Sequence, residues 1–231
     1  VEAFGSFVKR LNLTSYPYVG GAAPRTMIPV EAGNDIVYTA NEAPPDAVIP
    51  FHHELAQVQS PPKYLFFFCD VECTQGGETA LIDSTLVFRY VNETFPEFMA
   101  KLKEHGARYV RTIPAEDDQT SPIGRSYFNT YQVKTKEELI EKLDNIDDLR
   151  YEWQEDGSIR ITSEPIPAIK MISEYQNNSV FQYTFHNSVI AAFVGWEDSR
   201  NDRTQAVKFG NDESMPQDVL NSIAAFMEQH K

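Results

Sequence analysis

The chain has 231 residues, of which 42% are hydrophobic and 12% aromatic, so it can bury one sizeable core and is not a disordered protein. Its formal net charge is −14 at pH 7, which makes it a poor candidate for binding a nucleic-acid backbone or an anionic membrane. Its longest apolar run, residues 64–69, is far too short to span a bilayer.

The first third of the chain is expected to be mostly extended. Residues 63–72 are a continuous apolar and aromatic run of strand length, between Pro61-Pro62 and Gly76-Gly77. This pattern predicts a central buried strand. In chain order, the elements expected here are the end of a helix at 1–11 and strands at 36–40, 63–72 and 79–82.

Helical spacing dominates the middle of the chain. Gly106 is a plausible stop after two helical segments. Thr135 with Glu138 three residues later is a capping box, which predicts the start of a helix. The elements expected here are helices at 84–90 and 96–104, a strand at 109–113 and a helix at 135–143.

The last third alternates short strands with turns. Residues 155–158, Glu-Asp-Gly-Ser, predict a hairpin turn. The elements expected here are strands at 151–154, 159–162, 168–172 and 180–185, and a helix at 216–229 with Ser214 or Met215 near its cap. Many short strands and few peripheral helices predict a mostly β protein with flanking helices, of the α+β class, as one domain over 1–231. A parallel α/β fold is disfavoured because no strand–helix–strand period repeats.

Cysteines and sequons say little about the compartment. Cys69 and Cys73 favour two free thiols, although a disulfide across so short a loop is possible. Sequons begin at Asn12, Asn92 and Asn177, and such triplets arise often by chance. The localisation stays open, with the cytoplasm as the default and secretion not excluded.

The segment Phe51-His52-His53-Glu54 carries the first chemical signal. In an extended chain His52 and Glu54 point to one face and His53 to the other. An imidazole and a carboxylate so placed form two corners of a two-His-one-carboxylate site for non-haem Fe(II), whose third corner must be a distant His. Alone the triplet is weak, because ordinary half-buried histidines beside a surface Glu give the same pattern.

A second signal is Gly76-Gly77-Glu78-Thr79. Two glycines allow a tight turn, after which the Thr79 hydroxyl can face a carboxylate. A plain Gly-Gly turn explains this motif equally well when it is taken alone.

Together the motifs resemble the TauD/TfdA (taurine/α-ketoglutarate dioxygenase) superfamily, and within it the clavaminate synthase-like branch. The resemblance covers nearly the whole chain in order. It lies in residues 18–26, 39–45, 50–56, 65–69, 76–79, 121–125 and 195–198. It implies a double-stranded β-helix, a cupin-like jelly roll with flanking helices. It also implies that Fe(II), 2-oxoglutarate and O₂ are used to oxidise a C–H bond of a small molecule.

Residue by residue, the resemblance implies that His52 and Glu54 bind the iron and that the Thr79 hydroxyl contacts 2-oxoglutarate. It places Asn41 and Asn187 near the pocket. Arg125 stands in a shared motif and is expected to form a structural salt bridge.

The chain departs from this pattern at its ends. In the family a strand with the distal His, and then an Arg for 2-oxoglutarate, follow the helix in which residues 228–231 lie. The start also matches an internal family segment, so we expect the chain to be incomplete at both ends. His186 and His230 are poor substitutes for the distal His.

Three interpretations stay open. The natural protein is an Fe(II)/2-oxoglutarate oxygenase, or the chain is a non-catalytic binding or structural protein on the same scaffold. Alternatively, a partner chain or a second copy supplies the missing strands, because an incomplete jelly roll exposes strand edges and apolar faces.

Overall fold

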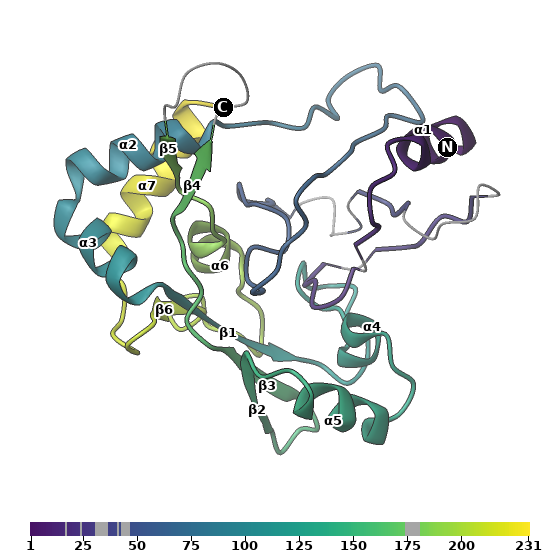
Figure 1. The fold of residues 1–231 in the computed structure, drawn as a ribbon. Coiled ribbons are helices and arrows are strands. Elements are labelled where there is room, and N and C mark those ends of the chain that lie inside the picture. The colour runs from purple at the N-terminus through teal and green to yellow at the C-terminus, as the bar shows by residue number, and fades with distance from the viewer. Residues whose placement is uncertain (17, 24, 31–36, 41, 43–46, 174–180) are drawn as a thin grey trace.

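The computed structural model describes residues 1–16, 18–23, 25–30, 37–40, 42, 47–173 and 181–231 (Figure 1). Its elements follow the chain in this order: α1 (Glu2–Arg10), α2 (Ser84–Thr94), α3 (Pro96–His105), β1 (Ala107–Ile113), α4 (Tyr127–Tyr131), α5 (Lys136–Asp144), β2 (Leu149–Trp153), β3 (Ile159–Ser163), β4 (Lys170–Ser173), β5 (Phe181–Thr184), α6 (Val189–Gly195), β6 (Val207–Phe209) and α7 (Gln217–Gln229).

A four-stranded sheet with the order β2-β3-β1-β6 organises the molecule, and β4 and β5 form a separate two-stranded sheet. Every pairing between these strands is antiparallel. In the hairpin β2-β3, Trp153 pairs with Ile159 across the predicted turn. The described residues therefore form antiparallel sheets with helices, as the sequence predicts for the α+β class.

The main core lies where α2, α3, α6 and α7 gather beside the sheets (Figure 1). Its centre contains Val91, Leu102 and Ile223, which are almost completely buried. A smaller core lies at the other end of β1, under α4 and α5, around Leu139 and Ile159. Burial of these side chains supplies most of the driving force for folding.

Local signals explain the helix boundaries. The Thr135 hydroxyl accepts a hydrogen bond from the Glu138 amide at 3.2 Å, as the predicted capping box requires. The Glu138 carboxylate accepts from the amide of Lys134 at 2.7 Å. Gly106 ends α3 with φ +70°, and a Cβ there would lie 2.6 Å from the carbonyl oxygen of Ile166. Gly106 is therefore required both for this backbone conformation and for this close approach.

The prediction of a central buried strand at residues 63–72 is wrong for this structure. The segment is irregular, and Tyr64, Phe67 and Val71 are 56%, 60% and 78% exposed. Residues 79–82 also form no strand, and described residues 37–40 contribute a single bridge, Met27 with Tyr38. Strand propensity needs a partner strand to take effect, and no described strand pairs with these segments.

Three elements were not predicted: α4, α6 and β6. Helix α6 is apolar all round, with Val189 through Phe193 buried, so it lacks the amphipathic period of a surface helix. The jelly-roll core and the single-domain organisation stay predictions. No helix in the described part of the chain is long and apolar enough to cross a membrane. Cys69 and Cys73 are free, as predicted, and both are exposed.

Candidate functional site

His52 and Glu54 line one cavity of about 90 Å³, as their spacing predicts. The cavity lies between the turn that carries them, the loop with Tyr18 and Arg25, and helix α6. The segment is not a strand: the chain turns at residues 54–57, with Leu55 at φ +52°. The two side chains nevertheless meet at the same space.

The His52 ring is held by its own backbone. Its Nδ1 lies 2.8 Å from the carbonyl oxygen of Pro50. A carbonyl oxygen can only accept, so this contact requires the proton on Nδ1 and leaves the Nε2 lone pair free. Such a contact fixes the tautomer of a histidine that ligates a metal.

One oxygen of the Glu54 carboxylate is held by an ion pair with Arg25. Its Oε2 accepts a hydrogen bond from Nη2 of Arg25 at 3.0 Å, and both side chains are about 85% buried. The Arg25 guanidinium also lies 4.7 Å from the centroid of the Tyr18 ring, and burial raises the pKa of that tyrosine. This ion pair fixes the orientation of Glu54, and no described residue forms a hydrogen bond with Oε1.

His53 faces away from the cavity. Its ring stacks on His186 with the centroids 4.2 Å apart. Burial, and then the neighbouring His186 ring, lower the pKa of His53 to about 4, so it is neutral near pH 7. His186 contacts His53 and does not line the cavity of His52 and Glu54. His230 is also remote from that cavity, because it stacks on Phe226 at the end of α7.

The other predicted site residues lie elsewhere. Thr79 is exposed in the irregular segment before α2 and lines neither described cavity. Asn187 is buried and its amide holds backbone: Nδ2 donates to the Ala168 carbonyl at 3.0 Å, and Oδ1 accepts from the Val189 amide at 2.9 Å. Asn41 lies outside the described residues.

The expectation of a salt bridge at Arg125 is wrong within the described residues. The Arg125 guanidinium lies 5.0 Å from the centroid of the Tyr18 ring, and its buried Nη1 has no hydrogen-bond partner. Burial lowers the pKa of Arg125.

Nowhere in the described part of the chain do three His, Cys, Asp or Glu side chains gather closely enough to hold a metal ion. His52 and Glu54 are therefore two donors without a third. Both donor types suit Fe(II), and two of them leave several coordination positions for other ligands.

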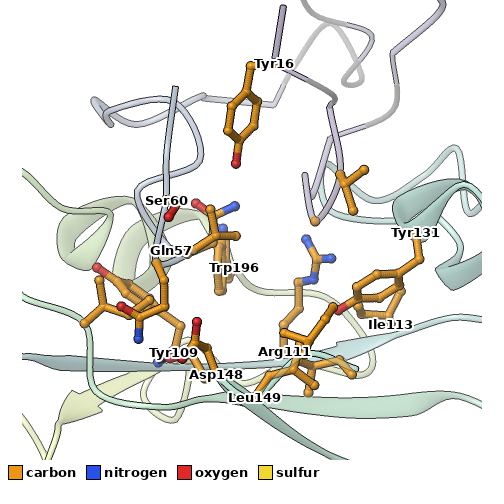
Figure 2. A pocket seen from close by; sticks show the side chains of 18 residues that line it. Tyr16, Gln57, Ser60, Tyr109, Arg111, Ile113, Tyr131, Asp148, Leu149 and Trp196 are labelled. Carbon is orange, nitrogen blue, oxygen red and sulfur yellow. Dashed lines mark hydrogen bonds between the residues drawn. The ribbon is translucent and has the colours of Figure 1, made fainter. Parts of the chain in front are cut away.

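A second cavity of about 300 Å³ lies beside the first, and both are lined by Gln57 and Trp196 (Figure 2). Sequence reasoning missed Arg25 and Arg111, which are the cations of the first and second cavity respectively. The signal available for Arg111 was its place in a predicted strand, where it alternates with the apolar Tyr109 and Ile113 on one face.

The chain belongs to the TauD/TfdA family, because residues 1–188 match the family described as taurine catabolism dioxygenase TauD, TfdA. It is 41% identical over 228 residues to a clavaminate synthase-like protein from Arabidopsis thaliana. That alignment covers 99% of this chain and 66% of the plant protein. A dapdiamide synthesis protein, DdaC, from Enterobacter agglomerans is 28% identical over 124 residues, which are 54% of this chain and 35% of that protein. The chain thus spans about two thirds of the plant relative and pairs with about one third of the bacterial one.

Proposed function

We propose that this chain carries part of the active site of an Fe(II)/2-oxoglutarate-dependent oxygenase that oxidises a C–H bond of a small molecule. The observation that supports it is the shared cavity of His52 and Glu54, in a chain that belongs to a dioxygenase family. The jelly-roll core, one domain over residues 1–231 and the clavaminate synthase-like type of chemistry belong to the same proposal.

His52 and Glu54 are suited to fill two of the coordination positions of Fe(II). His52 can coordinate through Nε2, because its Nδ1–H donates to the Pro50 carbonyl oxygen. Glu54 can coordinate through Oε1, because Oε2 accepts from Arg25. A bound Fe(II) with 2-oxoglutarate and O₂ would supply the oxidising power, which the side chains of a protein lack. Among the described residues that line this cavity there is no second histidine, and its arginine, Arg25, is paired with Glu54.

The side chains of this site have separable roles in the proposal. His52 and Glu54 bind the metal, and Arg25 positions Glu54 and compensates its charge during burial. Thr79 is proposed to donate its hydroxyl to a carboxylate of 2-oxoglutarate, which requires its segment to approach the cavity. Asn41 and Asn187 are proposed to lie at the border of the pocket, where Asn187 orders the start of α6.

The test is an anaerobic titration with Fe(II) and 2-oxoglutarate, read by the visible charge-transfer band of the ternary complex. We expect a band in the unchanged protein that is lost in His52→Ala and in Glu54→Ala. His105→Ala is the matched control, because His105 is partly exposed at the end of α3 and lines neither cavity. A band that survives both site substitutions would show that the metal binds elsewhere.

The second candidate is a non-catalytic binding or structural protein on the same scaffold. It is favoured by the exposed position of Thr79 and by the lack of a third metal donor among the described residues. The same titration separates the two, since a folded protein that gives no band with Fe(II) and 2-oxoglutarate supports this candidate. A partner chain or second copy that supplies the third ligand would restore the band on mixing.

A further inference from the structure

The larger cavity has the size and lining of a small-molecule site. Its volume is about 300 Å³, at the lower end of ligand pockets. Strands β1 and β3 form its floor, and Tyr16, residues 19–20 and the loop at residues 57–60 cover it (Figure 2). The walls are mainly apolar and aromatic side chains, among them Ile113, Ile161, Tyr109, Tyr131 and Trp196.

Arg111 is the cation of this cavity. It projects from β1 into the space between Trp196 and Tyr131 (Figure 2). It is only 6% exposed, and its buried Nη1 has no hydrogen-bond partner. No carboxylate of the described residues forms an ion pair with it. Asp148 also lines the cavity, but it is exposed and no ion pair joins the two.

A neighbour on the same strand shows how an arginine is normally accommodated here. Arg108 is equally buried and its Nε and Nη1 also lack a hydrogen bond, but it forms ion pairs with Asp212 at 3.2 Å and with Glu164 at 3.6 Å. Arg111 forms no ion pair with a described residue: its Cζ lies 5.8 Å from the ring centroid of Trp196, and Tyr131, Tyr18 and Asp198 act on it only through electrostatic interactions. Burial lowers the pKa of Arg111 accordingly. A buried cation without a paired anion is costly, and such a cost is retained where a ligand supplies the anion.

The chemistry of the ligand follows from the lining. A guanidinium presents two parallel N–H donors that match a carboxylate, and a single cation among apolar walls suits one negative charge. The aromatic and aliphatic walls favour a hydrophobic body next to that charge. We infer that the Arg111 cavity binds a small organic acid, with its carboxylate on Arg111 and its apolar body against Tyr109, Tyr131 and Trp196.

This site is distinct from the candidate iron site and adjoins it. Gln57 and Trp196 line both cavities, whereas His52, Glu54 and Arg25 line only the smaller one. A ligand on Arg111 would thus contact the wall of the iron cavity. The binding itself requires no metal, so the inference stands or fails independently of the proposed oxygenase activity.

The experiment measures binding of 3-phenylpropionate, octanoate and indole-3-acetate to the metal-free protein by calorimetry, each beside its uncharged amide. Trp196 fluorescence gives a second readout for the two acids that lack indole. We expect at least one acid to bind about 10-fold or more tightly than its amide, in line with the value of charge-assisted hydrogen bonds. Arg111→Met should lower the affinity for that acid to the affinity for its amide. Arg111→Lys should have an intermediate affinity.

Two controls separate this site from a structural role of Arg111. Arg160→Gln removes one positive charge on the neighbouring strand β3, outside the cavity, and should leave binding unchanged. Arg111→Met removes a buried unpaired charge, so its melting temperature should equal or exceed that of the unchanged protein. The inference is overturned if no acid binds more tightly than its amide, or if Arg111→Met binds the acid normally. A melting temperature lowered by Arg111→Met, with acid binding intact in Arg111→Lys, would assign the guanidinium to the fold instead.

Discussion

At the scale of single residues, the candidate site depends on which polar atoms of His52 and Glu54 already form hydrogen bonds within the protein. Pro50 accepts a hydrogen bond from one ring nitrogen of His52, and Arg25 donates one to one carboxylate oxygen of Glu54; both side chains line the cavity. These contacts are local consequences of the turn at residues 54–57 and of the loop with Arg25. They orient the two donors before any metal binds, which is the usual role of hydrogen bonds around metal ligands.

Arg25 is therefore predicted to act as a positioning residue for Glu54. Arg25→Gln should weaken Fe(II) binding by about 10- to 100-fold, the range for loss of such supporting contacts. Arg25→Lys should retain part of the affinity, because it keeps the charge without the planar geometry. The measurement is the Fe(II) dissociation constant under anaerobic conditions, with Arg89→Gln on the exposed face of α2 as the control. Tighter binding in Arg25→Gln would instead mean that the ion pair competes with the metal.

At the scale of elements, helix α5 begins where a short-range signal in the sequence places it. Thr135→Ala removes the hydroxyl that accepts from the Glu138 amide at the start of α5. We expect a loss of about 1 kcal/mol in the free energy of unfolding, the usual value of such a cap. Denaturant unfolding measures it, and Thr94→Ala at the exposed end of α2 should change stability by less than about 0.5 kcal/mol. Equal effects of the two substitutions would argue against the capping role.

A charged network joins two loops beside the sheet. Nη2 of Arg200 donates to Asp118 and to Asp198, each at 2.8 Å. Hydrogen bonds from Thr120, and then Arg200, lower the pKa of Asp118 to about 2. Burial opposes ionisation of Asp198, but hydrogen bonds from the Arg200 amide, Asn201 and Ser121 outweigh it and lower that pKa as well.

This network predicts a pH dependence of stability. Both carboxyls have folded pKa values below their ordinary value near 4, so the unfolded chain binds more protons in acid. Their contribution is complete above about pH 4 and is lost as the pH falls toward 2. Unfolding in urea at pH 3 and pH 6 measures the difference. Arg200→Gln should destabilise the protein at pH 6 by about 1–3 kcal/mol and reduce this difference. An undiminished difference in Arg200→Gln would assign the acid sensitivity to other carboxyls.

Local and long-range features of the chain were predictable to different degrees for one physical reason. Capping at Thr135, the stop at Gly106 and the turn at residues 155–158 act over a few residues, so the sequence alone reveals them. The pairing of residues 63–72 depends on a strand distant in sequence, which no local pattern specifies. The shared face of His52 and Glu54 was predictable from their spacing, whereas the unpaired state of Arg111 depends on which carboxylates the fold brings near it.

At the scale of the whole molecule, the segment before α2 is the largest difference between the sequence and the structure. Residues 63–72 have the composition of a buried strand, yet Tyr64 through Phe68 are between 37% and 60% exposed. In the described structure no backbone hydrogen bond joins residues 61–81 to another segment. The contacts of this segment are side-chain ones, such as the stacking of Phe68 on Phe4 with ring centroids 5.2 Å apart.

Amide hydrogen exchange tests whether residues 63–72 are an exposed irregular segment, as in the structure, or a buried strand, as the sequence predicts. Amides without hydrogen bonds exchange rapidly, so residues 63–72 should exchange within seconds while β1 and α7 stay protected for far longer. Mass spectrometry of the exchanging protein at two concentrations provides the measurement. Slow exchange at both concentrations would mean that the predicted buried strand forms within one chain, as the proposed jelly roll requires. Protection that increases with concentration would mean that the strand pairs with a second copy, because an apolar strand with free backbone groups is a template for association.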